Sequence, residues 1–154
     1  MLYKEFLKKK RACPFCRLSN QVIVTSKLSF LTYAVAPYTN GHLLVIPKRH
    51  VDSFLALTPA EHLDIEQLLE KGVAIVKYLG YSNYSILVRN GNNHQKSVKH
   101  LHYHIIPNHR IGDLDATGQP RTVLTKISEL ALIKTLKAVV KKCGFISDDR
   151  PSKK

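Results

Sequence analysis

The hydrophobic pattern of the first fifty residues predicts three strands joined by tight turns. Two runs, 22–24 and 28–35, are rich in β-branched and aromatic residues, and Ser26-Lys27 forms a short link between them. Turn-forming residues at 37–41 separate this pair from the run 42–47, whose Leu-Leu-Val-Ile centre is typical of a buried strand. The first part of the chain is therefore expected to form part of a sheet.

A long helix is predicted after these strands. Thr58 can cap its first turn, Pro59 suits the first helical position, and Glu61 completes a capping box. Gly80 is a typical residue to end the helix. Between these limits, apolar or small residues recur at the three- and four-residue spacing of a buried helix face: Ile65, Leu68, Leu69, Gly72, Val76 and Leu79.

The stretch 98–107, which follows a strand predicted at 84–89, alternates with period two. Three histidines, His100, His102 and His104, therefore share one face of an extended chain. The other face, which can pack on a core, carries Leu101, Tyr103 and Ile105. Burying imidazoles without partners is costly, so the three rings are expected to line a cleft. This repetition favours an active site over a solvated polar strand face.

The remaining pattern predicts one α+β domain over residues 1–154, with a core at about 12–144. A second amphipathic helix is predicted at about 127–143, and the tail 145–154 is polar. Residues 2–11 allow a short helix. The expected architecture is a small, mainly antiparallel sheet with one long mid-chain helix and a C-terminal helix.

Composition and charge narrow the class of protein. The chain has 154 residues, 44% of them hydrophobic and 23% charged, as in ordinary globular proteins. Neither a signal peptide nor a membrane span is recognisable, and three cysteines fit a reducing compartment, so a cytoplasmic location is expected. The net charge of +13 would attract polyphosphates or nucleic acid, but no nucleic-acid-binding module is recognisable.

Two chemistries could use the row of histidines. His-x-His on a strand can bind a metal, and a neutral imidazole can act as a nucleophile at pH 7. The Cys13-Pro14-Phe15-Cys16 motif has the spacing of half a zinc site, provided that two further ligands come from elsewhere. A redox pair would require a thioredoxin-like βαβ context, which this sequence lacks. A pair of packed thiols is the remaining alternative.

Two segments of the chain resemble the histidine triad (HIT) family of nucleotide hydrolases and transferases. The run 97–107, Ser-Val-Lys-His-Leu-His-Tyr-His-Ile-Ile-Pro, is similar to the family signature. The run 41–50, Gly-His-Leu-Leu-Val-Ile-Pro-Lys-Arg-His, is similar to its second landmark. The resemblance implies a small antiparallel sheet with a long helix, and it implies a homodimer.

The resemblance also implies roles for individual residues. His102 would be the nucleophile that attacks the α-phosphorus of a nucleotide and forms a covalent nucleotidyl-histidine. His104 would contact the phosphate, and Ser97 would lie beside the leaving group. Gln95 and Asn90, from the preceding loop, are the other expected substrate-binding residues.

In one branch of the family a structural zinc is held by two cysteines and two histidines. The matching positions here are Cys13, Cys16, His50 and His100, so the resemblance implies one zinc ion per chain. Four such ligands suit a closed tetrahedral site.

Two departures from the family pattern affect the expected substrate. Ala34 stands where an Asp or Asn usually binds the ribose hydroxyls, and Lys96 adds a positive charge beside the expected phosphate site. The predicted function is a hydrolase or transferase that cleaves the α-phosphate bond of dinucleoside polyphosphates or of nucleoside monophosphate esters and phosphoramidates. The alternatives are a nucleotide-binding module with little turnover and a metal-dependent hydrolase that uses the triad histidines as ligands.

Overall fold

A computed structural model describes residues 12–17, 21–91 and 98–108, together with residues 125, 127, 130 and 131. The chain divides into two compact units, Met1–Ile111 and Gly112–Lys154. The expectation of a single domain stays a prediction. The sheet, the long helix and the histidine segment all belong to the first unit.

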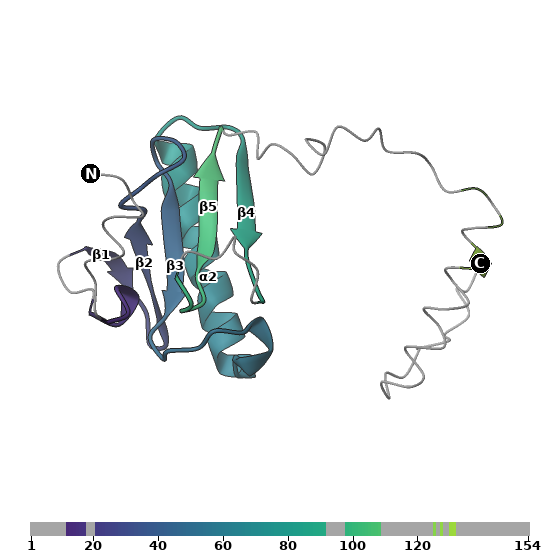
Figure 1. Cartoon of the computed structure of the whole chain (residues 1–154). Helices are drawn as coiled ribbons and strands as arrows, with labels where there is room; N and C mark the ends of the chain where they lie inside the picture. The colour runs from purple at the N-terminus through teal and green to yellow at the C-terminus, as the bar shows by residue number, and fades with distance from the viewer. Residues whose placement is uncertain are drawn as a thin grey trace, which may run out of the picture. The chain divides into compact units, whose positions relative to one another are not determined.

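The described strands of this unit form one antiparallel sheet, as the sequence predicts (Figure 1). Its five strands lie in the order β1-β2-β3-β5-β4. Their bounds are β1 Val22–Thr25, β2 Ser29–Tyr33, β3 Leu43–Pro47, β4 Tyr84–Val88 and β5 Tyr103–Pro107. Two short 3₁₀ helices, η1 (Phe15–Arg17) and η2 (Phe54–Ala56), precede β1 and the long helix. Because β5 inserts between β3 and β4, the histidine segment lies in the interior of the sheet.

The long helix α2, Pro59–Tyr78, has the boundaries that its end signals predict. Thr58 Oγ1 accepts a hydrogen bond from the Glu61 amide at 3.2 Å, and Glu61 Oε2 accepts one from the Thr58 amide at 2.8 Å. At the other end Gly80, with φ of 90°, donates to the Lys77 carbonyl, and Tyr81 donates to the Val76 carbonyl. These two bonds are those of a Schellman motif, so both ends of the helix are capped locally.

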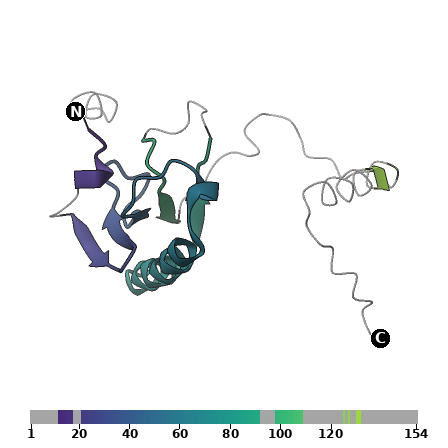
Figure 2. The same ribbon diagram turned by 90° about the horizontal axis from the view of Figure 1, so that it is seen from below.

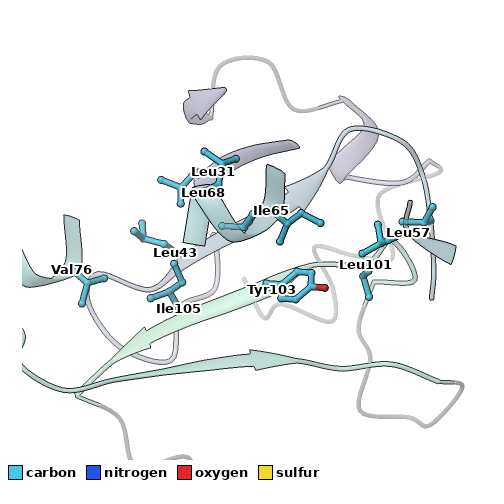
Figure 3. Packing of buried hydrophobic residues seen from close by; sticks show 11 residues of the cluster. Leu31, Leu43, Leu57, Ile65, Leu68, Val76, Leu101, Tyr103 and Ile105 are labelled. Atoms are coloured by element: carbon cyan, nitrogen blue, oxygen red, sulfur yellow. The ribbon is translucent and has the colours of Figure 1, made fainter. Parts of the chain in front are cut away.

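The helix α2 covers one face of the sheet (Figures 1 and 2). Ile65, Leu68 and Val76 of α2 pack against Leu31, Leu43 and Ile105 of the strands (Figure 3). Gly72 brings the two layers into close contact, because a Cβ there would collide with Ile105 Cδ1 and approach Leu31 Cδ1 to 2.9 Å. Leu79 departs from the predicted helix face and is exposed.

A buried carboxylate on α2 ties the helix to the β1–β2 turn. Asp64 accepts hydrogen bonds from the Ser26 hydroxyl at 2.6 Å and the Leu28 amide at 3.2 Å, and from the hydroxyl of Ser29. Although burial favours the neutral carboxyl, these donors favour its charged form, and the pKa of Asp64 is lowered. The Ser26-Lys27 link therefore forms a turn that the helix also holds.

The histidine segment differs from the predicted ten-residue strand. Strand β5 begins only at Tyr103, so His100 and His102 precede it. The Leu101 amide donates to the Val51 carbonyl at 2.7 Å, outside the β3–β5 ladder, which explains why the ladder stops before this residue. The alternation itself holds, because Leu101, Tyr103 and Ile105 lie in the core on the α2 side.

Two predicted elements lie wholly or mostly outside the described residues. The short helix at 2–11 lies wholly outside them. Of the predicted C-terminal helix only Ile127, Leu130 and Ala131 are described, and all three are helical. None of the helices in the described part of the chain combines the length and apolar composition that a bilayer crossing requires.

Candidate functional site

The three predicted histidines are buried, not arranged along an open cleft wall. The exposed fractions of His100, His102 and His104 are 0%, 7% and 9%. The expectation that they would avoid the interior was based on the cost of burying an imidazole without partners. Here each ring has a partner, so that cost is offset.

A fourth histidine belongs to the same cluster. His42 lies directly before β3, is 3% exposed, and its Nε2 is 3.0 Å from Nδ1 of His104. It was not among the site residues predicted from the sequence. The available signal was a polar, titratable residue at the start of an otherwise apolar strand, but its partner is 62 residues away in the chain.

Hydrogen bonds fix the tautomers of His42 and His104. The backbone amide of Tyr38 donates to His42 Nδ1 at 3.2 Å, so this nitrogen carries no proton. Neutral His42 therefore carries its proton on Nε2 and donates it to His104 Nδ1. As a result, His104 carries its own proton on Nε2, which makes that atom a hydrogen-bond donor.

The tautomer of His102 is fixed in the opposite sense. Its Nδ1 lies 2.8 Å from the carbonyl oxygen of His100, and only a protonated nitrogen can make this bond. The Nε2 of neutral His102 then carries a lone pair and no proton, as a nucleophile requires. The His102 and His104 rings lie edge to face with centroids 4.8 Å apart. A nucleophilic nitrogen and an N–H donor are therefore on adjacent rings.

Burial and neighbouring charges keep two of the rings neutral. Burial lowers the pKa of His104 to about 3, and His102, His42 and Arg89 lower it further through electrostatic repulsion. Burial also lowers the pKa of His100 to about 4, although its hydrogen bond to the Pro47 carbonyl opposes this shift. Both imidazoles are thus uncharged at pH 7.

A second cluster joins the two cysteines to two histidines. The ligand atoms of Cys13, Cys16, His50 and His100 all lie within 4.8 Å of one another. Sγ of Cys16 is 3.2 Å from Nδ1 of His50, and Sγ of Cys13 is 3.5 Å from Nδ1 of His100. Ligands around a tetrahedral zinc ion are separated by about 3.3–3.8 Å, as bond lengths of about 2.0 and 2.3 Å require. The cluster fits zinc.

The chemistry of the donor set agrees with this geometry. His100 donates from Nε2 to the Pro47 carbonyl at 2.9 Å, so its Nδ1, which faces the cysteines, has a lone pair that can bind a cation. Desolvation and the neighbouring Cys13 raise the pKa of the Cys16 thiol. A bound cation would therefore displace a thiol proton, as zinc does.

The loop between the cysteines also reaches the histidine cluster. The Phe15 ring lies edge-on to His102, with centroids 5.0 Å apart, and to His100 at 6.0 Å. Phe15 also packs against the apolar residues on the sheet face opposite α2: Phe30, Ala34, Leu44 and Ile46. Ala34 thus contributes apolar surface to this face and no ribose-binding group.

The remaining predicted site residues differ in position. Ser97 and Gln95 lie outside the described residues. Asn90 is exposed, and its side-chain oxygen accepts a hydrogen bond from the Phe54 amide at 2.9 Å. That contact ties the end of β4 to η2, a structural link that the sequence did not predict.

Comparison with known proteins identifies the family. The HIT domain family matches residues 17–111. The adenosine 5'-monophosphoramidase of Schizosaccharomyces pombe is 36% identical over 101 residues, which cover 62% of this chain and 74% of that protein. An asymmetrical bis(5'-nucleosyl)-tetraphosphatase of the same organism is 34% identical over 91 residues, or 58% of this chain and 50% of that protein.

A solved structure shares the fold. The histidine triad nucleotide-binding protein of Candida albicans superposes with a TM-score of 0.71 at 21% identity, covering 86% of this chain and 99% of that one. With the five-stranded antiparallel sheet, the histidine cluster and the matched family domain, the chain belongs to the HIT family.

Proposed function

We propose that this protein is a nucleotidyl hydrolase or transferase that cleaves the α-phosphate bond of dinucleoside polyphosphates or of nucleoside monophosphate esters and phosphoramidates. One observation carries the proposal: Nε2 of His102 bears a lone pair next to the Nε2–H donor of His104. Relatives that act as a monophosphoramidase and a tetraphosphatase support the substrate class.

The proposed reaction uses these two atoms. Nε2 of His102 forms a bond to the α-phosphorus while the bond from phosphorus to the leaving oxygen or nitrogen breaks and its electron pair departs with that atom. His102 keeps its Nδ1 proton on the His100 carbonyl, so the nucleotidyl-imidazole is cationic. Water, or another acceptor, then attacks phosphorus, releases the nucleotide and loses a proton. The His104 donor would stabilise charge on the phosphoryl oxygens.

The cysteine–histidine cluster is proposed to hold one structural zinc ion. Cys13, Cys16, His50 and His100 would be its four ligands, which leaves no position open for substrate. The ion would tie the segment 12–17 to the end of β3 and to the histidine segment. This assignment disfavours the alternative of a metal-dependent hydrolase, because the Nδ1 atoms of His102 and His104 both have hydrogen-bond partners.

The protein is further proposed to be a cytoplasmic homodimer. Strand β4 lies at one edge of the sheet, and Tyr84 and Ile86 are 39% and 49% exposed on it. Pairing of two β4 strands would cover these side chains and the backbone groups of the edge. It would also place the β5 strands of two protomers one strand away from the interface. The free thiols of Cys13 and Cys16 fit a reducing compartment.

The test is a panel of diadenosine tetraphosphate, diadenosine triphosphate and adenosine 5'-monophosphoramidate, with and without added phosphate. We expect turnover of at least one substrate, and acid-labile labelling of His102 by the nucleotide after brief reaction. A label on another residue would refute the mechanism. Nucleotide binding without any turnover would favour a binding module, which the loss of a ribose ligand at Ala34 makes the second candidate.

A further inference from the structure

Arg89 directly follows β4 and lies beside the histidine cluster. Leu87 pairs with His104, and Val88 pairs with Tyr103 and packs against the core on the α2 side. Because side chains alternate along a strand, Arg89 follows Val88 on the opposite face, the face of Leu87 and His104. The arginine is half-buried there.

A tyrosine links the guanidinium to the cluster. Nη1 of Arg89 donates to the Tyr38 hydroxyl at 3.3 Å. The Tyr38 ring is stacked on His42, with centroids 5.5 Å apart and an interplanar angle of 22°. His42 in turn donates to His104. Arg89 is also close enough for its charge to act on His104, as one of the causes of the lowered pKa of that ring.

The histidines and Arg89 offer different interactions to a substrate. At pH 7 neutral His104 provides a hydrogen-bond donor but no charge. Arginine stays protonated, and its planar fork matches two oxygens of a phosphate. A polyphosphate substrate carries negative charge on the leaving side of the α-phosphorus, whereas the leaving amine of a phosphoramidate carries none.

We propose that Arg89 is a specificity-determining residue that binds the phosphates of the leaving group and makes the enzyme favour dinucleoside polyphosphates over phosphoramidates. This inference rests on the proposed function only for the position of the α-phosphate next to His102. Tyr38 orients the guanidinium from the side of His42.

The experiment compares kcat/KM for diadenosine tetraphosphate and adenosine 5'-monophosphoramidate in the native protein, Arg89→Gln, Arg89→Lys and Tyr38→Phe. For Arg89→Gln we expect a loss of about 10- to 100-fold with the tetraphosphate and less than about 3-fold with the phosphoramidate. Arg89→Lys should fall between, because it keeps the charge but loses the fork. Tyr38→Phe keeps the ring and should show a smaller loss in the same direction.

Lys71→Gln provides the matched control. It removes one positive charge from an exposed position on α2, which covers the other face of the sheet. Both substrates should be cleaved as by the native protein. An equal loss with both substrates in Arg89→Gln, or a tetraphosphate-specific loss in Lys71→Gln, would overturn the proposal.

A binding measurement separates this inference from the proposed function. In a His102→Asn background, calorimetry would compare the affinities for diadenosine tetraphosphate and AMP with Arg89 present and with Arg89→Gln. Selective weakening of tetraphosphate binding supports the role of Arg89 even if the native protein shows no turnover. Unchanged or equally reduced affinities would refute it.

Discussion

Each histidine in the cluster is oriented by a group of the main chain or by another histidine. Tyr38 N–H fixes His42, His42 fixes His104, and the carbonyl oxygens of His100 and Pro47 fix His102 and His100. The nitrogen that carries the proton in each ring is therefore determined before a substrate arrives. Preorganised donors and acceptors of this kind need no reorganisation during the reaction.

Removal of the proposed nucleophile should separate chemistry from folding. We expect His102→Asn to fold and to bind a nucleoside monophosphate, because Leu101, Tyr103 and Ile105 still pack on the opposite side. Its kcat should fall by several orders of magnitude, as loss of an essential covalent group usually causes. Steady-state kinetics and calorimetry would measure both effects. His62→Asn, on α2, is the control, and near-native rates in His102→Asn would exclude this nucleophile.

Substitution of His42 should act through the tautomer of His104. His42→Leu removes the Nε2–H donor and leaves His104 Nδ1 without that partner, so we expect kcat to fall by about 10- to 100-fold. Imidazole ¹⁵N chemical shifts should show that His104 no longer holds its proton on Nε2 alone. His42→Gln can still accept from Tyr38 and donate to His104, and should retain more activity. An unchanged tautomer in His42→Leu would contradict the relay.

At the level of single residues, local pattern predicted the core side of the histidine segment but not the partners of its polar side. Alternation placed Leu101, Tyr103 and Ile105 correctly. His42 and the buried carboxylate of Asp64 were missed, because their partners lie 62 and up to 38 residues away in the chain. Sequence spacing reports on neighbours within an element, and these contacts form only when elements pack.

The beginning of α2 combines a cap with an ion pair. Glu61 accepts from the Thr58 amide and also binds Arg49, whose Nε and Nη2 lie 2.9 and 2.7 Å from its carboxylate oxygens. These hydrogen bonds, that from Arg49 above all, lower the pKa of Glu61 to about 2 although burial opposes them. The pair fixes the loop that carries His50 against the helix.

Glu61→Gln should reduce stability in a pH-dependent way. A carboxylate with a pKa of about 2 in the folded state stabilises the protein above its usual pKa of about 4.5 and loses this effect as the pH falls towards 2. We expect a loss of roughly 1 kcal/mol at pH 7, since Arg49 is 51% exposed and solvent screens the pair. Denaturant titrations between pH 7 and 2.5 should show this difference shrinking below about pH 4.5. Glu66→Gln, exposed on the same helix, should show no such trend.

The contact between α2 and the sheet leaves no space for a methyl group at Gly72. Gly72→Ala would gain about 1 kcal/mol of helix propensity, but it forces Ile105 and Leu31 to move. Overpacking of a core typically costs about 1–3 kcal/mol, so we expect a net loss of about 1 kcal/mol or more in the free energy of unfolding. Ala74→Gly, at an exposed position, gives the propensity effect alone. Greater stability of Gly72→Ala would show that the layers can separate at low cost.

At the level of elements, the ends of α2 were predictable because their signals are local. The capping box and Gly80 determine where the helix begins and ends without distant contacts. The start of β5 was not predictable, since it depends on the bond from Leu101 to Val51. A period-two pattern therefore identified the face of the segment more reliably than its strand boundaries.

The whole molecule should lose stability when the proposed zinc is removed. Elemental analysis of protein purified without chelator should find one zinc ion per chain, and chelation should lower the unfolding temperature, because binding energy at a closed site contributes to folding. Cys13→Ser should lower the metal content, whereas Cys143→Ser should not. Full metal content in Cys13→Ser would refute the assignment.

The proposed dimer has a simple test. Light scattering at moderate salt should give about twice the chain mass of 17.4 kDa. Ile86→Lys places two like charges across a paired β4 edge and should yield the monomer, while Lys71→Gln should not. A species of single-chain mass under all salt conditions would refute the dimer, to which the net charge of +13 is opposed.

The position of Phe15 makes the nucleophile a reporter of the metal loop. An aromatic ring shifts the NMR resonances of nuclei near its plane, and the Phe15 ring lies 5.0 Å from His102 within the segment bounded by Cys13 and Cys16. Displacement of that segment would change the ring current at His102. The proton resonances of the His102 imidazole should thus follow metal occupancy in resting enzyme, without any substrate or turnover.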